Sequence, residues 1–136
     1  MRLAILMVLL LLPKLSVAGT GSFDCKVVSV HSVTAEGTLL TEAEHLKGQI
    51  GSTFSVERSS GEIRGGQFIN NRASEAIRVV NEPVDNSYYV ISTSHGPAKS
   101  ISYLYIANYR KWLQKPFTYT GSGEYIYSGY CTSSIK

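Results

Sequence analysis

The chain has 136 residues and a formal net charge of +3 at pH 7, and this length fits one domain with a hydrophobic core of its own. Two basic residues, Arg2 and Lys14, fall in an N-terminal segment that we expect to be removed, and the others are spread along the chain from Lys26 to Lys136. Because no Lys/Arg cluster occurs in the remaining sequence, nucleic acid is not expected as a partner.

The N-terminus has the pattern of an export signal. A basic start precedes the apolar run from Leu3 to Leu12, Pro13 ends the run, and small residues up to Ala18 precede a cleavage point. As a helix the run rises about 15 Å, roughly half of the hydrocarbon core of a bilayer. We therefore predict a signal peptide over 1–18 rather than an uncleaved anchor. The remaining 19–136 form a single β-rich domain without a membrane span, periplasmic or secreted.

Two cysteines, Cys25 and Cys131, remain after this cleavage. An even number of cysteines in an exported protein suggests a disulfide, and only one pairing exists here. Two separate buried thiols are the alternative. No Cys-x-x-Cys pair occurs, so the cysteines are expected to be structural rather than redox-active.

The first predicted strand covers 23–33. Its apolar residues change phase at Val27 and Val28, so that the two halves of the strand place their apolar side chains on opposite faces. A bulge at this point, or burial of both faces, would reconcile the two halves.

A short helix is predicted to follow. Thr41 and Glu44 have the spacing of a capping box, and Gly48 is placed to cap the C-terminus. A helix of barely two turns is marginal by itself, so we expect Leu46 and Ile50 to hold it by packing.

The clearest local signal is a β-hairpin between Thr53 and Phe68. Phe54 and Val56 alternate with polar residues, and a Ser-Ser-Gly break ends in Gly61, which can take the positive φ of a bulged turn. Charged residues flank the turn on both sides, namely Glu57, Arg58, Glu62 and Arg64. We interpret them as ion pairs on a solvated hairpin and not as an acid–base pair.

The C-terminal half contains further short elements. Segment 74–80 is ambiguous between a helical turn and a strand, and a helical turn is expected over 110–115 before Pro116. Strands are predicted over 87–94, 101–109 and 124–131.

About seven or eight short strands separated by turn signals predict a mostly β fold. The architecture is expected to be a single antiparallel small barrel, or a sandwich, with one short helix. A disulfide from Cys25 in the first strand to Cys131 at the end of the last would place these two strands side by side. Such adjacency closes an up-and-down meander on itself, which favours the barrel.

Three short motifs occur together in this sequence. They are Phe23-x-Cys25 near the expected mature start, Phe54-x-Val56-Glu57-Arg58-x-x-Gly61 in the hairpin, and Tyr127-Ser128-Gly129-x-Cys131 near the end. The combination resembles a group of small exported proteobacterial proteins of unassigned function. The resemblance implies export, one disulfide and a single β-rich domain, and it implies no activity.

The residues that commonly carry catalysis or bind metal show no strong pattern. His31, His45 and His95 lie in three different predicted elements, whereas a metal site needs three or four converging ligands. Neither a Gly-x-Ser-x-Gly elbow nor a phosphate-binding Gly-rich loop with Lys occurs. We therefore assign no catalytic residue, no metal and no cofactor.

Tyrosine is the unusual feature of the composition, since most of the nine tyrosines lie between Tyr103 and Tyr130. Cross-strand packing would explain this placement, and so would an aromatic recognition surface. If strands 101–109 and 124–131 adjoin, two tyrosines from each would form one patch. The candidate binding residues are Tyr103, Tyr105, Trp112, Tyr125 and Tyr127.

Three functions follow as hypotheses. The first is an exported, non-enzymatic binding domain that holds a protein partner through its tyrosine-rich face. The second is a small barrel that carries an apolar small molecule in its interior. The third is a hydrolase that uses one of the histidines, which requires a carboxylate or serine within hydrogen-bonding distance of that histidine in a cleft.

Overall fold

The computed structural model describes residues 21–41, 44–81, 87–109, 111–121, 123 and 125–134. The predicted signal peptide over 1–18 lies outside the described residues. So do Glu42 and Ala43 of the predicted helix start, the side chain of His45, and Arg110 at the start of the predicted helical turn.

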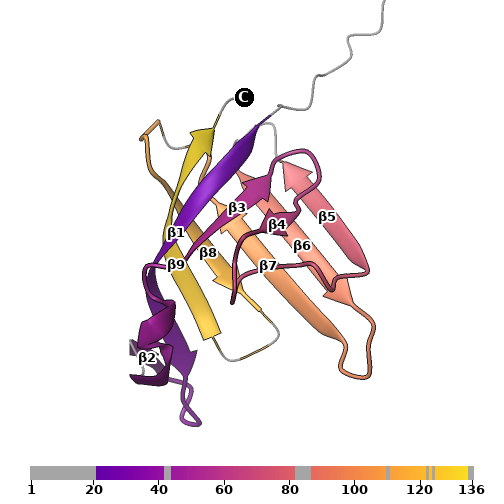
Figure 1. Ribbon diagram of the computed structural model, residues 1–136. Coiled ribbons are helices and arrows are strands. Elements are labelled where there is room, and N and C mark those ends of the chain that lie inside the picture. Colours follow the sequence, from indigo (N-terminus) through magenta and orange to yellow (C-terminus); the bar gives the residue numbers. More distant parts are fainter. Residues whose placement is uncertain are drawn as a thin grey trace, which may run out of the picture.

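Strands dominate the described part of the chain. They are β1 Ser22–Val33, β2 Leu39–Thr41, β3 Thr53–Glu57, β4 Ile63–Arg64, β5 Ala76–Asn81, β6 Tyr88–Ser94, β7 Ser100–Ile106, β8 Lys115–Thr120 and β9 Tyr125–Ser134, with a 3₁₀ helix η1 at Glu44–Gln49. Eight of these strands follow one another in the order β4-β3-β1-β9-β8-β7-β6-β5, and β2 pairs with β1 beside this path. The sheet curls into a half-barrel, in which β3 and β4 lie across from β5 and β6 (Figure 1).

The strand order is that of an up-and-down meander that returns to its first strand. β1 lies between β3 and β9, so the first and last strands are neighbours, and all the pairs are antiparallel. Within the described residues no ladder joins β4 to β5, and the barrel is open there. The predicted mostly β, antiparallel, barrel-like fold is therefore confirmed, as one curved sheet rather than a sandwich of two.

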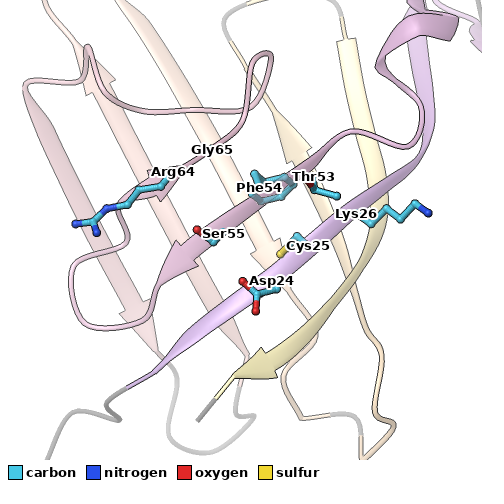
Figure 2. A pocket seen from close by; sticks show the side chains of 8 residues that line it. All are labelled: Asp24, Cys25, Lys26, Thr53, Phe54, Ser55, Arg64 and Gly65. Carbon is cyan, nitrogen blue, oxygen red and sulfur yellow. The ribbon is translucent and has the colours of Figure 1, made fainter. Parts of the chain in front are cut away.

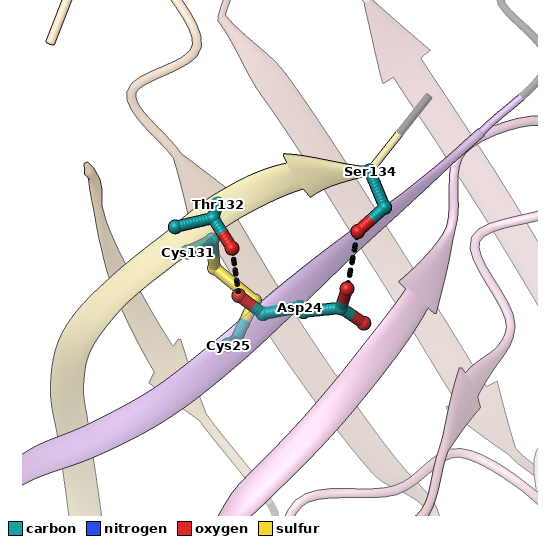
Figure 3. The surroundings of a disulfide bond; sticks show 5 residues. All are labelled: Asp24, Cys25, Cys131, Thr132 and Ser134. Atoms are coloured by element: carbon teal, nitrogen blue, oxygen red, sulfur yellow. Dashed lines mark hydrogen bonds between the residues drawn. A yellow bond between two sulfur atoms is a disulfide. The ribbon is translucent and has the colours of Figure 1, made fainter. Parts of the chain in front are cut away.

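The predicted disulfide between the first and last strands is confirmed. Cys25 and Cys131 lie directly opposite each other in the β1–β9 ladder and are bonded. Both are buried. On the outer side of the same ladder, Asp24 accepts hydrogen bonds from Thr132 and Ser134 (Figure 3). The termini of the described domain are thus joined by a covalent bond as well as by a ladder.

The phase change in the first strand is a β-bulge. The β1–β9 register shifts between Val27 and Ser29, so Val27 and Val30 both reach the core while Val28 points to solvent. Gly129 pairs with Val27 at this point, and a Cβ on Gly129 would overlap the Lys26 carbonyl oxygen. The bulge therefore depends on a residue without a side chain in β9.

The β3–β4 hairpin covers part of the open side of the barrel. Its turn residue Gly61 has the predicted positive φ, 73°, and packs against Val79 of β5 and Val90 of β6. The hydroxyl of Tyr88 lies 3.2 and 3.0 Å from the carbonyl oxygens of Glu57 and Arg58. Side-chain contacts across the core, rather than a ladder, hold the two ends of the sheet together.

The prediction for the short helix is wrong in its details. Gly48 lies within the 3₁₀ helix and does not cap it. Thr41 ends β2, and its hydroxyl lies 3.2 Å from Nδ1 of His31. The rest of the predicted capping box falls partly outside the described residues. Leu46 is buried as expected, because η1 packs against β1 through this side chain.

Two strands, β2 and β8, were not predicted. β8 begins at Lys115 and contains Pro116, whose carbonyl oxygen accepts a hydrogen bond from the Ala107 amide. The described residues 111–114 form no helical turn, which corrects the expectation for 110–115. The ambiguous segment 74–80 is largely strand β5.

Candidate functional site

The inner face of β6 and β7 changes character along the strands. At one end the inward residues are apolar and belong to the core, and at the other end they are serines. The cross-strand pairs run Tyr88–Ile106, Val90–Leu104, Ser92–Ser102 and Ser94–Ser100. Inward positions of a small barrel are normally filled by apolar side chains. The four inward serines therefore indicate a part of the interior that is not packed as hydrophobic core.

These serines line one side of an open cleft. It consists of two adjoining hollows of about 370 and 130 Å³ that share Asn70 and Tyr119. The larger hollow is lined by the rings of Phe68, Tyr119, Tyr125 and Tyr127, and the smaller by the four serines. We call this site the tyrosine–serine cleft.

Hydrogen bonds hold the cleft walls in place. The side-chain amide of Asn71 donates to Ser92 Oγ at 3.1 Å and to the Gly61 carbonyl at 2.9 Å, and its oxygen accepts from the Ile63 amide at 2.8 Å. Ser94 Oγ and Ser100 Oγ lie 2.5 Å apart. Asn71 is only 3% exposed, so it joins the hairpin rigidly to the floor of the cleft.

The cleft is polar but uncharged. Among the described lining residues there is no carboxylate, ammonium, guanidinium or imidazole group. Burial raises the pKa of Tyr119, and burial together with the neighbouring tyrosines raises that of Tyr127. Both phenols therefore stay protonated near neutral pH and can donate hydrogen bonds.

The predicted tyrosine patch is not formed. Tyr127 lies on the inner face in register with Tyr119, and Tyr125 packs against the core beside it. Tyr103 and Tyr105 point outward from β7, where each ring contacts that of Tyr89 in a tilted arrangement, with centroids 5.8 and 5.1 Å apart. β8 separates β7 from β9, and the two pairs of tyrosines face opposite sides of the sheet.

Trp112 lies apart from both groups, in the connection between β7 and β8. It borders a surface hollow of about 510 Å³ together with Leu113, Pro116 and Tyr130. The candidate residues therefore divide among three places on the molecule.

Tyr119, Asn71 and the four serines were not among the site residues predicted from the sequence. Tyr119 was not predicted because strand β8 contains Pro116, and proline argues against a strand. The alternation of Phe117 and Tyr119 with threonines is nevertheless a strand pattern. The serines of β6 and β7 continue the two-residue alternation of these strands, so they lie on the same inner face as Val90 and Leu104. A run of inward positions that changes from apolar to hydroxyl residues was the signal available for this site.

His31 and His95 do not line the described pockets. His31 Nε2 lies 3.1 Å from Ser29 Oγ, and both residues belong to the outer face of β1. The Nδ1 atom of His95 lies 2.6 Å from Oε2 of Glu75, and both side chains are exposed. In the described part of the chain, no group of three or more His, Cys, Asp or Glu could hold a metal ion.

Another hollow, of about 390 Å³, lies over β1, β3 and β4. Its charged residues Asp24, Lys26 and Arg64 point away from one another (Figure 2). Arg64 instead pairs with Glu62 at 2.6 Å, which lowers the pKa of that exposed carboxyl. Glu62 and Arg64 thus form a solvated ion pair, whereas Arg58 lies over the ring of Phe23 at 4.4 Å from its centroid. The hollow has no convergent set of groups.

No family model, curated protein or solved structure matches this chain. The resemblance to small exported proteobacterial proteins stays a prediction. Among the residues with described structure, no helix has the length and apolar character needed to cross a membrane.

Proposed function

We propose that this protein is an exported, non-catalytic binding domain whose tyrosine–serine cleft holds a small neutral ligand rich in hydroxyl groups, such as a short oligosaccharide. The observation that carries the proposal is the change of the inner face of β6 and β7 from core residues to serines beside an aromatic wall. Concave sites with aromatic walls and a few fixed polar groups are the usual form of small-molecule sites.

The lining groups match both surfaces of a sugar. Tyrosine rings present a negative face to the weakly positive C–H groups of a sugar ring. Serine hydroxyls and asparagine amides both donate and accept hydrogen bonds, as sugar hydroxyls do. An uncharged cleft favours a neutral ligand, because an ion would be desolvated there without a partner.

The test is a titration of the oxidised protein with a panel of neutral di- and trisaccharides, followed by NMR of the tyrosine rings. We expect shifts for the cleft tyrosines. Tyr119→Phe keeps the ring but removes a hydroxyl from the cleft wall that Tyr119 shares with Ser102, and it should weaken binding about tenfold. The matched control is Tyr103→Phe, the same change on the outer face. Equal affinities for the two variants, or no binding of any saccharide, would contradict the proposal.

A protein partner on the outer face is the second candidate. The contacting rings of Tyr89, Tyr103 and Tyr105 favour it, since tyrosine is enriched at the centres of interfaces. The test is a pull-down from the periplasmic extract of the source cell. A stoichiometric partner that is lost with Tyr103→Ser and kept with Tyr119→Phe would support this candidate.

The other two hypotheses have less support. Core side chains such as Phe23, Leu104 and Phe117 occupy the interior of the half-barrel, where an apolar ligand would need space. A hydrolase would need a histidine in a cleft, and His31 and His95 lie outside the described pockets.

A further inference from the structure

We propose that segment 111–114, in the connection between β7 and β8, is a peripheral membrane-contact site that places Trp112 and Leu113 in the interface of an anionic lipid surface. This inference is independent of the tyrosine–serine cleft. It rests on two neighbouring apolar side chains, on the charge around them, and on their position at the end of a loop.

The apolar side chains are unusually exposed. Leu113 is 84% and Trp112 59% exposed, and Leu113 has the most exposed large apolar side chain among the described residues. They border an open hollow with Pro116 and Tyr130 and are not part of the core. Large apolar side chains that a domain leaves in water next to each other mark a surface that contacts something else.

The charge of this region is complementary to an anionic surface. From Asp85 to Glu124 the intervening sequence contains Lys99, Arg110, Lys111 and Lys115 and no acidic residue. Lys111 directly precedes the apolar pair, and Lys115 follows it after Gln114. Lysine stems can lie along apolar surface while their ammonium groups reach lipid headgroups, and basic residues beside an apolar anchor strengthen binding to anionic lipid.

The shape favours a membrane over a protein. A protein interface buries a broad patch with aromatic residues at its centre, whereas here two consecutive side chains project from one loop. Tryptophan prefers the boundary between hydrocarbon and water, because its ring is apolar and its N–H needs a polar partner. One Trp–Leu pair supports weak and reversible contact.

The test uses the fact that Trp112 is the single tryptophan of the chain. The oxidised protein, purified after export, is titrated with vesicles of equal parts phosphatidylglycerol and phosphatidylcholine. We expect a blue shift of the tryptophan emission and cosedimentation with the vesicles. Leu113→Ser should lower the partition coefficient about tenfold. Lys111→Gln should lower it about fivefold on these vesicles and leave it unchanged on pure phosphatidylcholine.

The matched control is Leu39→Ser, the same change at a side chain of β2 that is 58% exposed, and it should bind vesicles like the unmodified protein. Absence of a blue shift, or equal losses for Leu113→Ser and Leu39→Ser, would overturn the proposal. Copurification of one protein that depends on Leu113, without vesicle binding, would also overturn it and assign the loop to a protein partner.

Discussion

At the scale of single residues, Gly61 meets two requirements at one position. Its φ of 73° lies in the left-handed region, and a Cβ there would lie 2.8 Å from Val79 Cγ2 and 3.0 Å from Val90 Cγ1. The turn of the hairpin can approach β5 and β6 only because this residue has no side chain. Gly61 therefore permits the contact that covers the open side of the barrel.

Gly61→Ala should lower the free energy of unfolding by about 2–4 kcal/mol, since it adds overpacking to an unfavourable φ. Gly37→Ala is the matched control, because Gly37 has a φ of 77° but no neighbouring heavy atom within 4 Å. It should cost only about 1 kcal/mol. Urea unfolding measures both, and equal losses would mean that the contact with β5 and β6 has no energetic weight.

Tyr88 links stability to pH. Burial raises the pKa of its phenol, whereas a tyrosine in an unfolded chain ionises near pH 10. Below about pH 10 the phenol is protonated in both states, so its contribution to stability is complete there. As the pH rises toward the folded pKa, the unfolded state loses the proton first, and this contribution is lost.

We therefore expect the free energy of unfolding to fall by about 1 kcal/mol per pH unit above about pH 10 for each such tyrosine. Tyr88→Phe should reduce this slope, and it should also cost stability near neutral pH because it removes the hydrogen bonds to Glu57 and Arg58. Brief urea titrations near pH 8 and pH 11, with free thiols assayed to verify the disulfide, measure the effect. An unchanged slope in Tyr88→Phe would show that this phenol is not the linked group.

At the scale of elements, the segment between β4 and β5 connects the hairpin to the rest of the sheet. β4 has only two residues, Ile63 and Arg64, and a strand so short has little stability of its own. The Asn71 side chain adds three hydrogen bonds, to the Ile63 amide, the Gly61 carbonyl and Ser92. One buried amide thus replaces the ladder that β4 and β5 do not form.

Asn71→Ala should cost about 2–4 kcal/mol, because it leaves a buried amide and a buried carbonyl without partners. Hydrogen exchange of the Ile63 amide should accelerate more than that of the β8–β9 ladder. Asn70→Ala is the control, since Asn70 makes one longer bond, 3.3 Å, to the Gln67 carbonyl. Equal protection of Ile63 in both variants would contradict this role for Asn71.

The elements also show where sequence patterns predict structure well. The hairpin β3–β4 was predicted because alternation and a Ser-Ser-Gly turn are local signals. β8 was not predicted, because Pro116 is a general signal against strands. In the structure the Pro116 carbonyl bonds the Ala107 amide and β9 lies along its other side, an arrangement that no local pattern contains.

At the scale of the whole molecule, the disulfide fixes the junction where the meander returns to its start. It closes a loop of 106 residues, and a loop of that length corresponds to about 4–5 kcal/mol of chain entropy as an upper figure. The rest of the sheet cannot provide this constraint, because the barrel is open between β4 and β5.

The double variant Cys25→Ser, Cys131→Ser should lose several kcal/mol of stability, up to about 4–5 kcal/mol. Urea unfolding with and without reductant measures this. The oxidised unmodified protein should lose stability on reduction by a similar amount, while the variant should not respond to reductant. If reduction left the stability of the unmodified protein unchanged, the β1–β9 ladder alone would set the stability of this junction.

The sequence by itself determined the β class of the domain, the one possible cysteine pairing, the phase change in the first strand and the hairpin at Gly61. These features follow from local alternation and turn chemistry, which act within a few residues, and from a cysteine count that allows only one pairing. Only the tertiary structure decided which tyrosines face inward and which residues form the cleft. The alternation in a strand assigns its side chains to two faces but does not show which face is the inner one. Strands far apart in sequence become neighbours only when the sheet is assembled. For that reason Tyr125 and Tyr127 line the cleft with Tyr119 and the serines, while Tyr103 and Tyr105 lie on the other side of the sheet.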